Sequence, residues 1–337
     1  MKKILLSLLA LFCVICLSGC GKETEKTVLD KLSKKIDKTS GYKMEAEMEL
    51  INNEDSYKYD VTISYKEKDN YRVSLRNKTS NHEQIILKND EGVYVLTPTL
   101  NKSFKFQSKW PYNNSQSYLI QSVISDMKND SKLSMKKEDG NYVFTSKVNF
   151  KNNPSLTKQK VIVDKNSNIK RVTVYDDEGK AQIKVVFNSI DMNAKFDDNY
   201  FVLEENMEAW DQNSTAEETQ TQSKELEEAI YPMYLPEGTY LETEKTIDLD
   251  EGSRVILTFA GETPFMLVEE TVSKEDEMTV IPTNGDLDIF ANSIAIIGES
   301  TVSFMNDGVE YYLVSSDMTT DELINVAKSI SVMPVGK

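Results

Sequence analysis

The stretch that decides the fold is residues 42–65, YKMEAEMELINNEDSYKYDVTISY, where apolar and polar side chains alternate along two runs. In the first run Met44, Ala46 and Met48 alternate with charged residues, and residues 57–65 repeat the alternation. A period of two is typical of strands that have one buried and one solvated face. Asn and Asp in the break at residues 52–55 favour a turn. The stretch therefore predicts an antiparallel hairpin with one face buried.

The pattern continues on both sides of this hairpin. Runs with the same character, separated by Asn, Asp and Gly, predict strands at residues 71–75, 84–87, 93–96 and 104–106, at Leu133, and at residues 142–148, 159–163, 169–175 and 181–190. Apolar side chains at helical spacing predict helices over residues 27–38 and 115–127. A sheet of about ten or more strands tends to curl. We therefore expect an α+β fold: a strongly curved antiparallel half-barrel sheet with both helices on one face.

The N-terminus has the pattern of an export signal. Lys2 and Lys3 precede an apolar run over residues 4–17, and the run ends in Leu17-Ser18-Gly19-Cys20. Such a run is shorter than the roughly 20 residues that a membrane span needs, and it is typical of a secretory signal. The small residues before Cys20 resemble a bacterial lipobox. That resemblance implies removal of residues 1–19 and a diacylglycerol, with fatty acids such as palmitate, on Cys20. The alternative is a plain signal peptide with an incidental cysteine.

The number of cysteines and the distribution of charge limit which bonds, domains and partners the chain can have. Cys13 and Cys16 lie in the signal, so a mature chain would keep only Cys20, which excludes an internal disulfide. Residues 21–207 carry 31 Lys and Arg against 28 Asp and Glu, whereas residues 208–337 carry 6 against 27. This asymmetry indicates two domains. The acidic half disfavours a nucleic-acid partner.

The composition predicts four segments. They are a signal at residues 1–19, a half-barrel domain at 20–207, an acidic polar linker at 208–229, and a smaller acidic α+β domain at 230–337. In the last we expect an antiparallel sheet with strands at residues 253–259, 265–271, 288–291, 294–298, 301–306 and 309–315. A closing helix is expected over residues 319–331, with Thr319 and Glu322 as a capping box.

The hairpin motifs carry a resemblance to a known family. Residues 85–106, with Asn89-Asp90-Glu91-Gly92 at the turn and Pro98 after the strand, resemble a hairpin of LolA/LolB-like proteins, as do residues 141–201. With the lipobox and the N-terminal helix, the chain resembles lipoproteins of spore-forming Firmicutes, of the YdcC sporulation type and the GerS germination type. Residues 231–240, YPMYLPEGTY, resemble a module of Firmicute sporulation and anti-sigma proteins. Unlike the soluble LolA carrier, this chain is expected to be lipid-anchored.

Few residues are suited to catalysis. His82 is the sole histidine and lies in a polar stretch, where a surface turn is the ordinary interpretation. The sequence contains no Walker loop, no Gly-rich dinucleotide loop and no Gly-x-Ser-x-Gly motif. We therefore expect no enzyme, no cofactor and no metal site.

An aromatic run is the candidate binding groove. In a half-barrel the central loop and helix lie over the concave mouth, where aromatic side chains can line an apolar groove. The candidate residues are Phe104, Phe106, Trp110, Tyr112 and Tyr118. Core packing without a ligand is the alternative.

Two functions from different classes follow. The first is a non-catalytic interaction protein, anchored through Cys20 to the extracytoplasmic face of the cell membrane, that docks or activates a wall or cortex enzyme or a signalling protein in sporulation or germination, as the resemblance implies. The second is a carrier or sensor that binds a lipid or lipoprotein acyl chain in the half-barrel cavity. An apolar pocket of about 300 Å³ or more favours the carrier, and a filled interior favours the interaction protein.

Overall fold

The computed structural model describes residues 23–330 apart from 53–54, 113, 214–225, 227, 276, 291–292 and 307. The expected signal and Cys20 lie outside the described residues, as does most of the expected linker. Within the part described, no helix is both long and apolar enough to span a bilayer. The fold is α+β and mainly antiparallel, with two sheets, as the sequence predicts.

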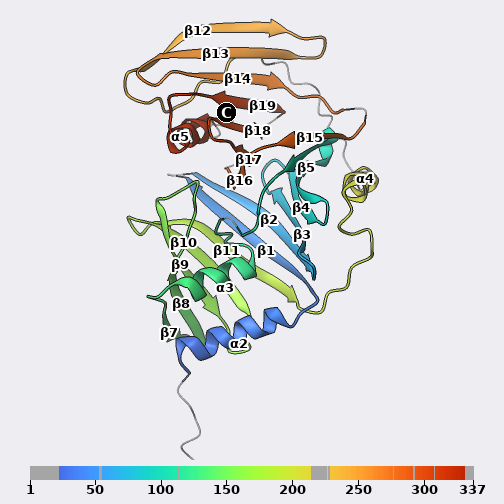
Figure 1. The fold of residues 1–337 in the computed structure, drawn as a ribbon, viewed down its shortest axis with the longest axis vertical. Coiled ribbons are helices and arrows are strands. Elements are labelled where there is room, and N and C mark those ends of the chain that lie inside the picture. Colours follow the sequence, from blue (N-terminus) through green and yellow to red (C-terminus); the bar gives the residue numbers. More distant parts are fainter. Residues whose placement is uncertain are drawn as a thin grey trace, which may run out of the picture.

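The larger sheet has twelve strands in the order β15-β6-β5-β4-β3-β2-β1-β11-β10-β9-β8-β7 (Figure 1). Eleven of them come from the N-terminal half: β1 Gly41–Asn52, β2 Asp55–Lys66, β3 Asn70–Asn77, β4 Glu83–Asn89, β5 Gly92–Thr97, β6 Lys102–Phe106, β7 Ser134–Glu138, β8 Asn141–Lys147, β9 Leu156–Val163, β10 Ile169–Asp176 and β11 Ala181–Asp191. All neighbours among these eleven are antiparallel. A short 3-10 helix, η1 (Pro98–Leu100), joins β5 to β6.

Two helices cover one face of this sheet. The alternation in β1 turns Tyr42, Met44 and Met48 into the core, where each is at most 1% exposed. Helices α2 (Glu25–Asp37) and α3 (Ile120–Asn129) contribute apolar side chains to the same core and lie across the same face (Figure 1). The apolar stripes of the two helices predict this arrangement.

Both helices start elsewhere than expected. Thr24 caps α2 and exchanges hydrogen bonds with Thr27, so the helix begins at Glu25, two residues before the predicted start. Helix α3 begins at Ile120 rather than at residue 115. The hydroxyl of Ser115 accepts from the Asn149 amide at 2.8 Å and donates to Asp126 at 3.0 Å, which holds the preceding residues in a loop.

The opposite face of the sheet carries a smaller cover. Helix α4 (Leu203–Asn213) continues past residue 207, where the linker was expected to begin. It forms because Leu203 and Met207 pack with Leu87 and Tyr94 of the sheet. Asn206 of the same helix accepts a hydrogen bond from Arg72 at 2.6 Å. The helix boundary is therefore set by contacts with distant strands.

The second sheet has seven strands in the order β12-β13-β14-β19-β18-β17-β16. The strands are β12 Thr239–Asp248, β13 Ser253–Gly261, β14 Phe265–Thr271, β16 Asp286–Ile289, β17 Ile294–Ile297, β18 Thr301–Asn306 and β19 Val309–Val314. Helix α5 (Thr320–Ile330) packs on one face. The predicted capping box is confirmed: the Thr319 amide donates to Glu322 at 2.9 Å, and the Glu322 amide donates to the Thr319 hydroxyl at 3.3 Å.

Two strands were not predicted. Strand β12 is exposed on both faces along most of its length, so it shows no regular burial pattern. Strand β15 (Thr279–Thr283) contains Pro282, which lacks an amide donor and is found mainly on sheet edges. It pairs in parallel with β6, a partner far away in the sequence.

The two sheets share a core. Side chains from the C-terminal half, Val272, Leu287, Ile294 and Met305, belong to the apolar cluster of the larger sheet. Hydrogen bonds at this core also join the halves. The Ile294 amide donates to the Gln84 side chain at 2.6 Å. The Tyr59 hydroxyl donates to the Phe290 carbonyl at 3.2 Å.

Replacing Gln84 by Leu should loosen this junction. The Ile294 amide would lose its buried acceptor, which costs about 1–3 kcal/mol. Amide hydrogen exchange should accelerate in β15, β16 and β17, and urea denaturation should show the lost stability. The matched control is Gln159→Leu, because Gln159 is equally buried but bonds Ser146 within the larger sheet. Unchanged exchange in β15–β17 of Gln84→Leu would contradict the shared junction.

Candidate functional site

The five aromatic residues expected to form a groove occupy two environments. Phe104, Phe106, Trp110 and Tyr118 are at most 8% exposed and belong to the shared core. Tyr112 is 65% exposed, and its hydroxyl donates to Asp69. The structure thus brings four of the five together as packed interior side chains and leaves Tyr112 at the surface.

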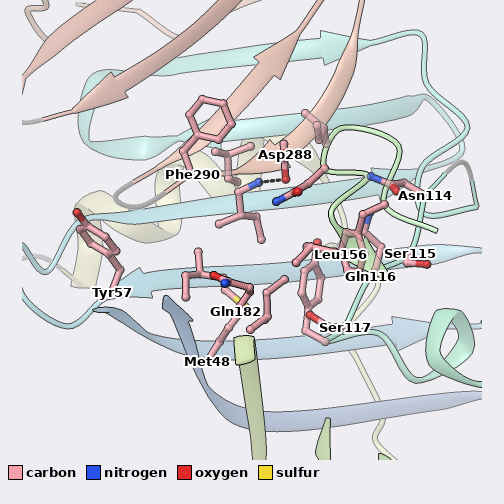
Figure 2. A pocket seen from close by; sticks show the side chains of 18 of the residues that line it. Met48, Tyr57, Asn114, Ser115, Gln116, Ser117, Leu156, Gln182, Asp288 and Phe290 are labelled. Carbon is pink, nitrogen blue, oxygen red and sulfur yellow. Dashed lines mark hydrogen bonds between the residues drawn. The ribbon is translucent and has the colours of Figure 1, made fainter. Parts of the chain in front are cut away.

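A cavity lies beside this cluster, at the junction of the two sheets. It has a volume of about 150 Å³. One wall comes from β1, β2 and β11 and includes Met48, Tyr57 and Gln182 (Figure 2). The opposite wall comes from the C-terminal half and includes Asp288 and Phe290. Of the predicted aromatic residues, Tyr118 lines this cavity, and Phe104 lines a smaller one.

Polar groups form a large part of the cavity wall. Figure 2 shows Asn114, Ser115, Gln116 and Ser117 on a loop that approaches the Asp288 side of the cavity. Burial raises the pKa of the Asp288 carboxyl, while the charge of Lys328 and a hydrogen bond from the Ile289 amide, at 2.9 Å, lower it. A mixed wall of this kind suits a few water molecules or a small polar molecule. Ligand pockets for drug-sized molecules are usually about 300–1,000 Å³.

A second buried carboxyl lies away from the cavity. The side chain of Glu269 on β14 is fully buried, and both of its oxygens accept from the Ile230 amide, at 2.9 and 3.2 Å. Burial is the main cause that raises the pKa of Glu269 to about 7, with a smaller contribution from the nearby Glu244 carboxylate, and the Ile230 hydrogen bond opposes the shift. The sequence held a signal for this residue. Phe265, Leu267 and Glu269 alternate, which puts the glutamate on the buried face.

Comparison with known proteins identifies the family. The family described as "Sporulation protein YdcC-like" matches residues 1–201. The chain is 34% identical over 332 residues to the "Sporulation protein YdcC" of Bacillus subtilis (strain 168). The aligned region covers 98% of this chain and 97% of the B. subtilis protein. The chain belongs to the YdcC-like sporulation protein family. The match to the B. subtilis relative extends over both sheets of this YdcC-like protein.

Solved structures similar to this YdcC-like chain are distant. A chain of the Pseudomonas aeruginosa MucA/MucB complex covers 90% of this chain and 96% of its own length at 12% identity, with a TM-score of 0.34. A chain from the structure of the Clostridioides difficile CwlD amidase in complex with the GerS lipoprotein matches 52% of this chain and 96% of its own length. The identity is 19% and the TM-score is 0.28. Similarity at this level carries nothing about ligands or partners.

Residues with metal-binding chemistry are scattered in this YdcC-like protein. Over the described part of residues 23–330, no three His, Cys, Asp or Glu side chains are grouped so that they could hold an ion. The backbone of His82 is held in a turn, where its carbonyl accepts from the Asn77 amide at 2.9 Å. This matches the surface-turn interpretation of that residue.

The raised pKa of Glu269 predicts a pH-dependent stability. A carboxyl whose folded-state pKa lies above its unfolded value stabilises the protein most below about pH 4.5, and that contribution is lost as the pH rises through about 7. Glu269→Gln should therefore be more stable than the wild type at pH 8, by on the order of 2 kcal/mol, and should lose this advantage at pH 5. Urea denaturation at the two pH values measures the difference.

The control for this experiment is Glu251→Gln, which changes an exposed carboxylate in the turn between β12 and β13. Its stability should follow the wild type at both pH values. Equal stability of Glu269→Gln and the wild type at pH 8 would show that the Glu269 carboxylate is not penalised by its site.

Proposed function

We propose that this YdcC-like protein is a lipid-anchored, non-catalytic interaction module that acts in sporulation at the extracytoplasmic face of the cell membrane. The observation that carries the proposal is the full-length similarity to a sporulation protein. We further propose that its larger sheet and two covering helices are a half-barrel of the LolA type. In this proposal the C-terminal half closes the concave mouth and leaves sheet edges and surfaces for a protein partner.

The start of the described chain supports an anchored end. Glu23 accepts hydrogen bonds from Lys137 at 2.7 Å and from Tyr142 at 2.5 Å, and Lys31 lies 3.6 Å away. These bonds, with that from Lys137 contributing most, lower the pKa of Glu23 to about 2. Three residues span at most about 11 Å, so a lipid on Cys20 would hold this end of the larger sheet near the bilayer. Figure 1 shows the second sheet at the opposite end of the molecule.

The filled interior favours an interaction protein over an acyl carrier. The apolar face that a carrier would use is covered by α2 and α3 and, at the junction, by Leu287 and Ile294. The remaining cavity of about 150 Å³ has a mixed polar and apolar wall and is smaller than typical ligand pockets. The acyl carrier stays as the alternative, and it requires the junction to open.

Replacing Cys20 by Ala tests the anchor. The precursor should stay uncut, should take up no labelled palmitate, and should lose its membrane attachment through lipid, because the thiol is the proposed acceptor. Metabolic labelling followed by fractionation measures all three. Cys13→Ala is the matched control, because that cysteine lies within the expected signal, and it should label normally. Normal palmitate labelling of Cys20→Ala would refute the anchor.

The interaction role is tested in sporulating cells of the host. Chemical crosslinking of the tagged full chain should yield a defined protein complex that depends on Cys20. Native mass spectrometry of the same purified protein should show no bound acyl chain. A retained acyl ligand together with the absence of any crosslinked protein would overturn the interaction role and favour the carrier.

A further inference from the structure

Four strands form the ends of the two sheets among the described residues: β15, β7, β16 and β12. An end strand presents unpaired backbone groups that can pair with another chain. Strand β15 has five residues and contains Pro282, which blunts an edge. Strand β16 has four residues and borders the cavity at the junction. Strand β7 has five residues and lies beside Glu23, at the proposed membrane end.

Strand β12 differs from the other three. It has ten residues, contains no proline, and pairs with β13 on one side. No described element pairs with its other side. Figure 1 shows it at the end of the molecule farthest from α2. It is therefore the longest open edge in the described structure, and it would face away from the bilayer.

The surroundings of this edge are acidic. Eight carboxylates and two basic side chains lie in the described residues 228–262. One of the two basic residues, Arg254, is paired with Glu270 at 2.6 Å. Along β12 itself Glu242, Glu244 and Asp248 are exposed. A strand that pairs here would gain from lysine or arginine side chains opposite these carboxylates.

Exposed aromatic and apolar side chains border the same edge. Tyr240 is 58% exposed and Leu241 is 39% exposed, both on β12. Tyr231 donates a hydrogen bond to Glu244 at 2.6 Å and is 44% exposed. The β13 partners show that Leu241 and Glu244 lie on one face of the sheet, while Tyr240 and Ile247 lie on the other. Asp248 shares the face of Glu244, whereas Thr243 and Lys245 share the face of Tyr240 and Ile247. A pairing strand would thus meet two carboxylates on one face, and on the other face two apolar side chains with a threonine and a lysine between them.

We propose that β12 binds an extended, lysine- or arginine-rich segment of a partner protein, which adds to the second sheet as an eighth strand. The proposal rests on the interaction role proposed above and assigns it a surface. Backbone hydrogen bonds supply affinity in this mode of recognition, and alternate side chains supply specificity. In the partner, basic side chains would alternate with apolar ones. A second copy of this chain is a poorer occupant, because two acidic edges would place like charges opposite each other.

The test uses the full chain purified from its host and three labelled peptides of the length of β12. The first alternates lysine with valine. The second replaces each lysine by glutamate. The third keeps the lysines but carries N-methyl groups on alternate backbone amides, which removes donors needed for a strand. The lysine peptide should bind by fluorescence anisotropy and should slow amide hydrogen exchange at residues 239–248, and neither control peptide should do so.

Two matched variants locate the binding. Glu242→Lys with Asp248→Lys reverses two edge charges and keeps the bond between Tyr231 and Glu244. This double substitution should weaken the binding of the lysine peptide by about tenfold or more. Glu299→Lys with Asp317→Lys makes the same change in net charge near α5, away from β12, and should bind within about twofold of the wild type. Circular dichroism checks that both variants fold.

Three results would overturn the assignment: equal binding of the N-methylated peptide, binding without protection of residues 239–248, and protection of these residues by a second copy alone as the protein concentration rises. Any of them, combined with a crosslinked partner in cells, would leave the interaction role standing and remove β12 as its surface. Peptide pairing at β12 without any partner in cells would instead count against the interaction role.

Discussion

The parallel pairing of β15 with β6 is the constraint on which the arrangement of the two halves depends. It requires the chain to leave the second sheet after β14, cross to the larger sheet, and return as β16. The return places Leu287 and Ile294 against the interior of the larger sheet. An apolar face that would otherwise need a ligand or a lid is thereby covered from within the chain. Separating the halves would expose this shared apolar surface to water, which is unfavourable.

The local part of the fold could be predicted from the sequence because it depends on neighbours. The alternation in β1 and β2, with Asn and Asp between them, determines a hairpin wherever that hairpin lies. The apolar residues at helical spacing in α2 and α3 likewise indicate which face of each helix is buried. The acidic residues after 207 suggested a linker. Helix α4 nevertheless extends there, because Met207 packs in one apolar cluster with Tyr94 from a distant strand. That contact leaves no periodic signal long enough to recognise.

The candidate site could be predicted only in part, for a related reason. Phe104, Phe106, Trp110 and Tyr118 were recognised as one group, and they do lie in one cluster. Whether such a group lines a groove or fills a core depends on what covers it, and here the cover includes Leu287 and Ile294, far along the chain. Strand β12 was not predicted because both of its faces are exposed, so its sequence has no alternation of buried and exposed residues. Periodic patterns in a sequence reflect burial within the chain. A surface that contacts another molecule is therefore the hardest feature to predict from them.

The distribution of charge differs between the two ends of the molecule, and the proposed function depends on this difference. The N-terminal half is nearly neutral, and the C-terminal half carries most of the net negative charge. Electrostatic repulsion from an anionic bilayer is screened within about 8–10 Å at physiological salt. With the proposed anchor close to α2, the acidic second sheet would lie at the opposite end of the molecule (Figure 1). In the proposed arrangement most of the excess negative charge would lie away from the membrane, where it would attract the proposed basic partner from solution. The packed junction matters for this proposal, because the shared core joins the halves so that the open edge of β12 lies at the end of the molecule opposite the proposed anchor.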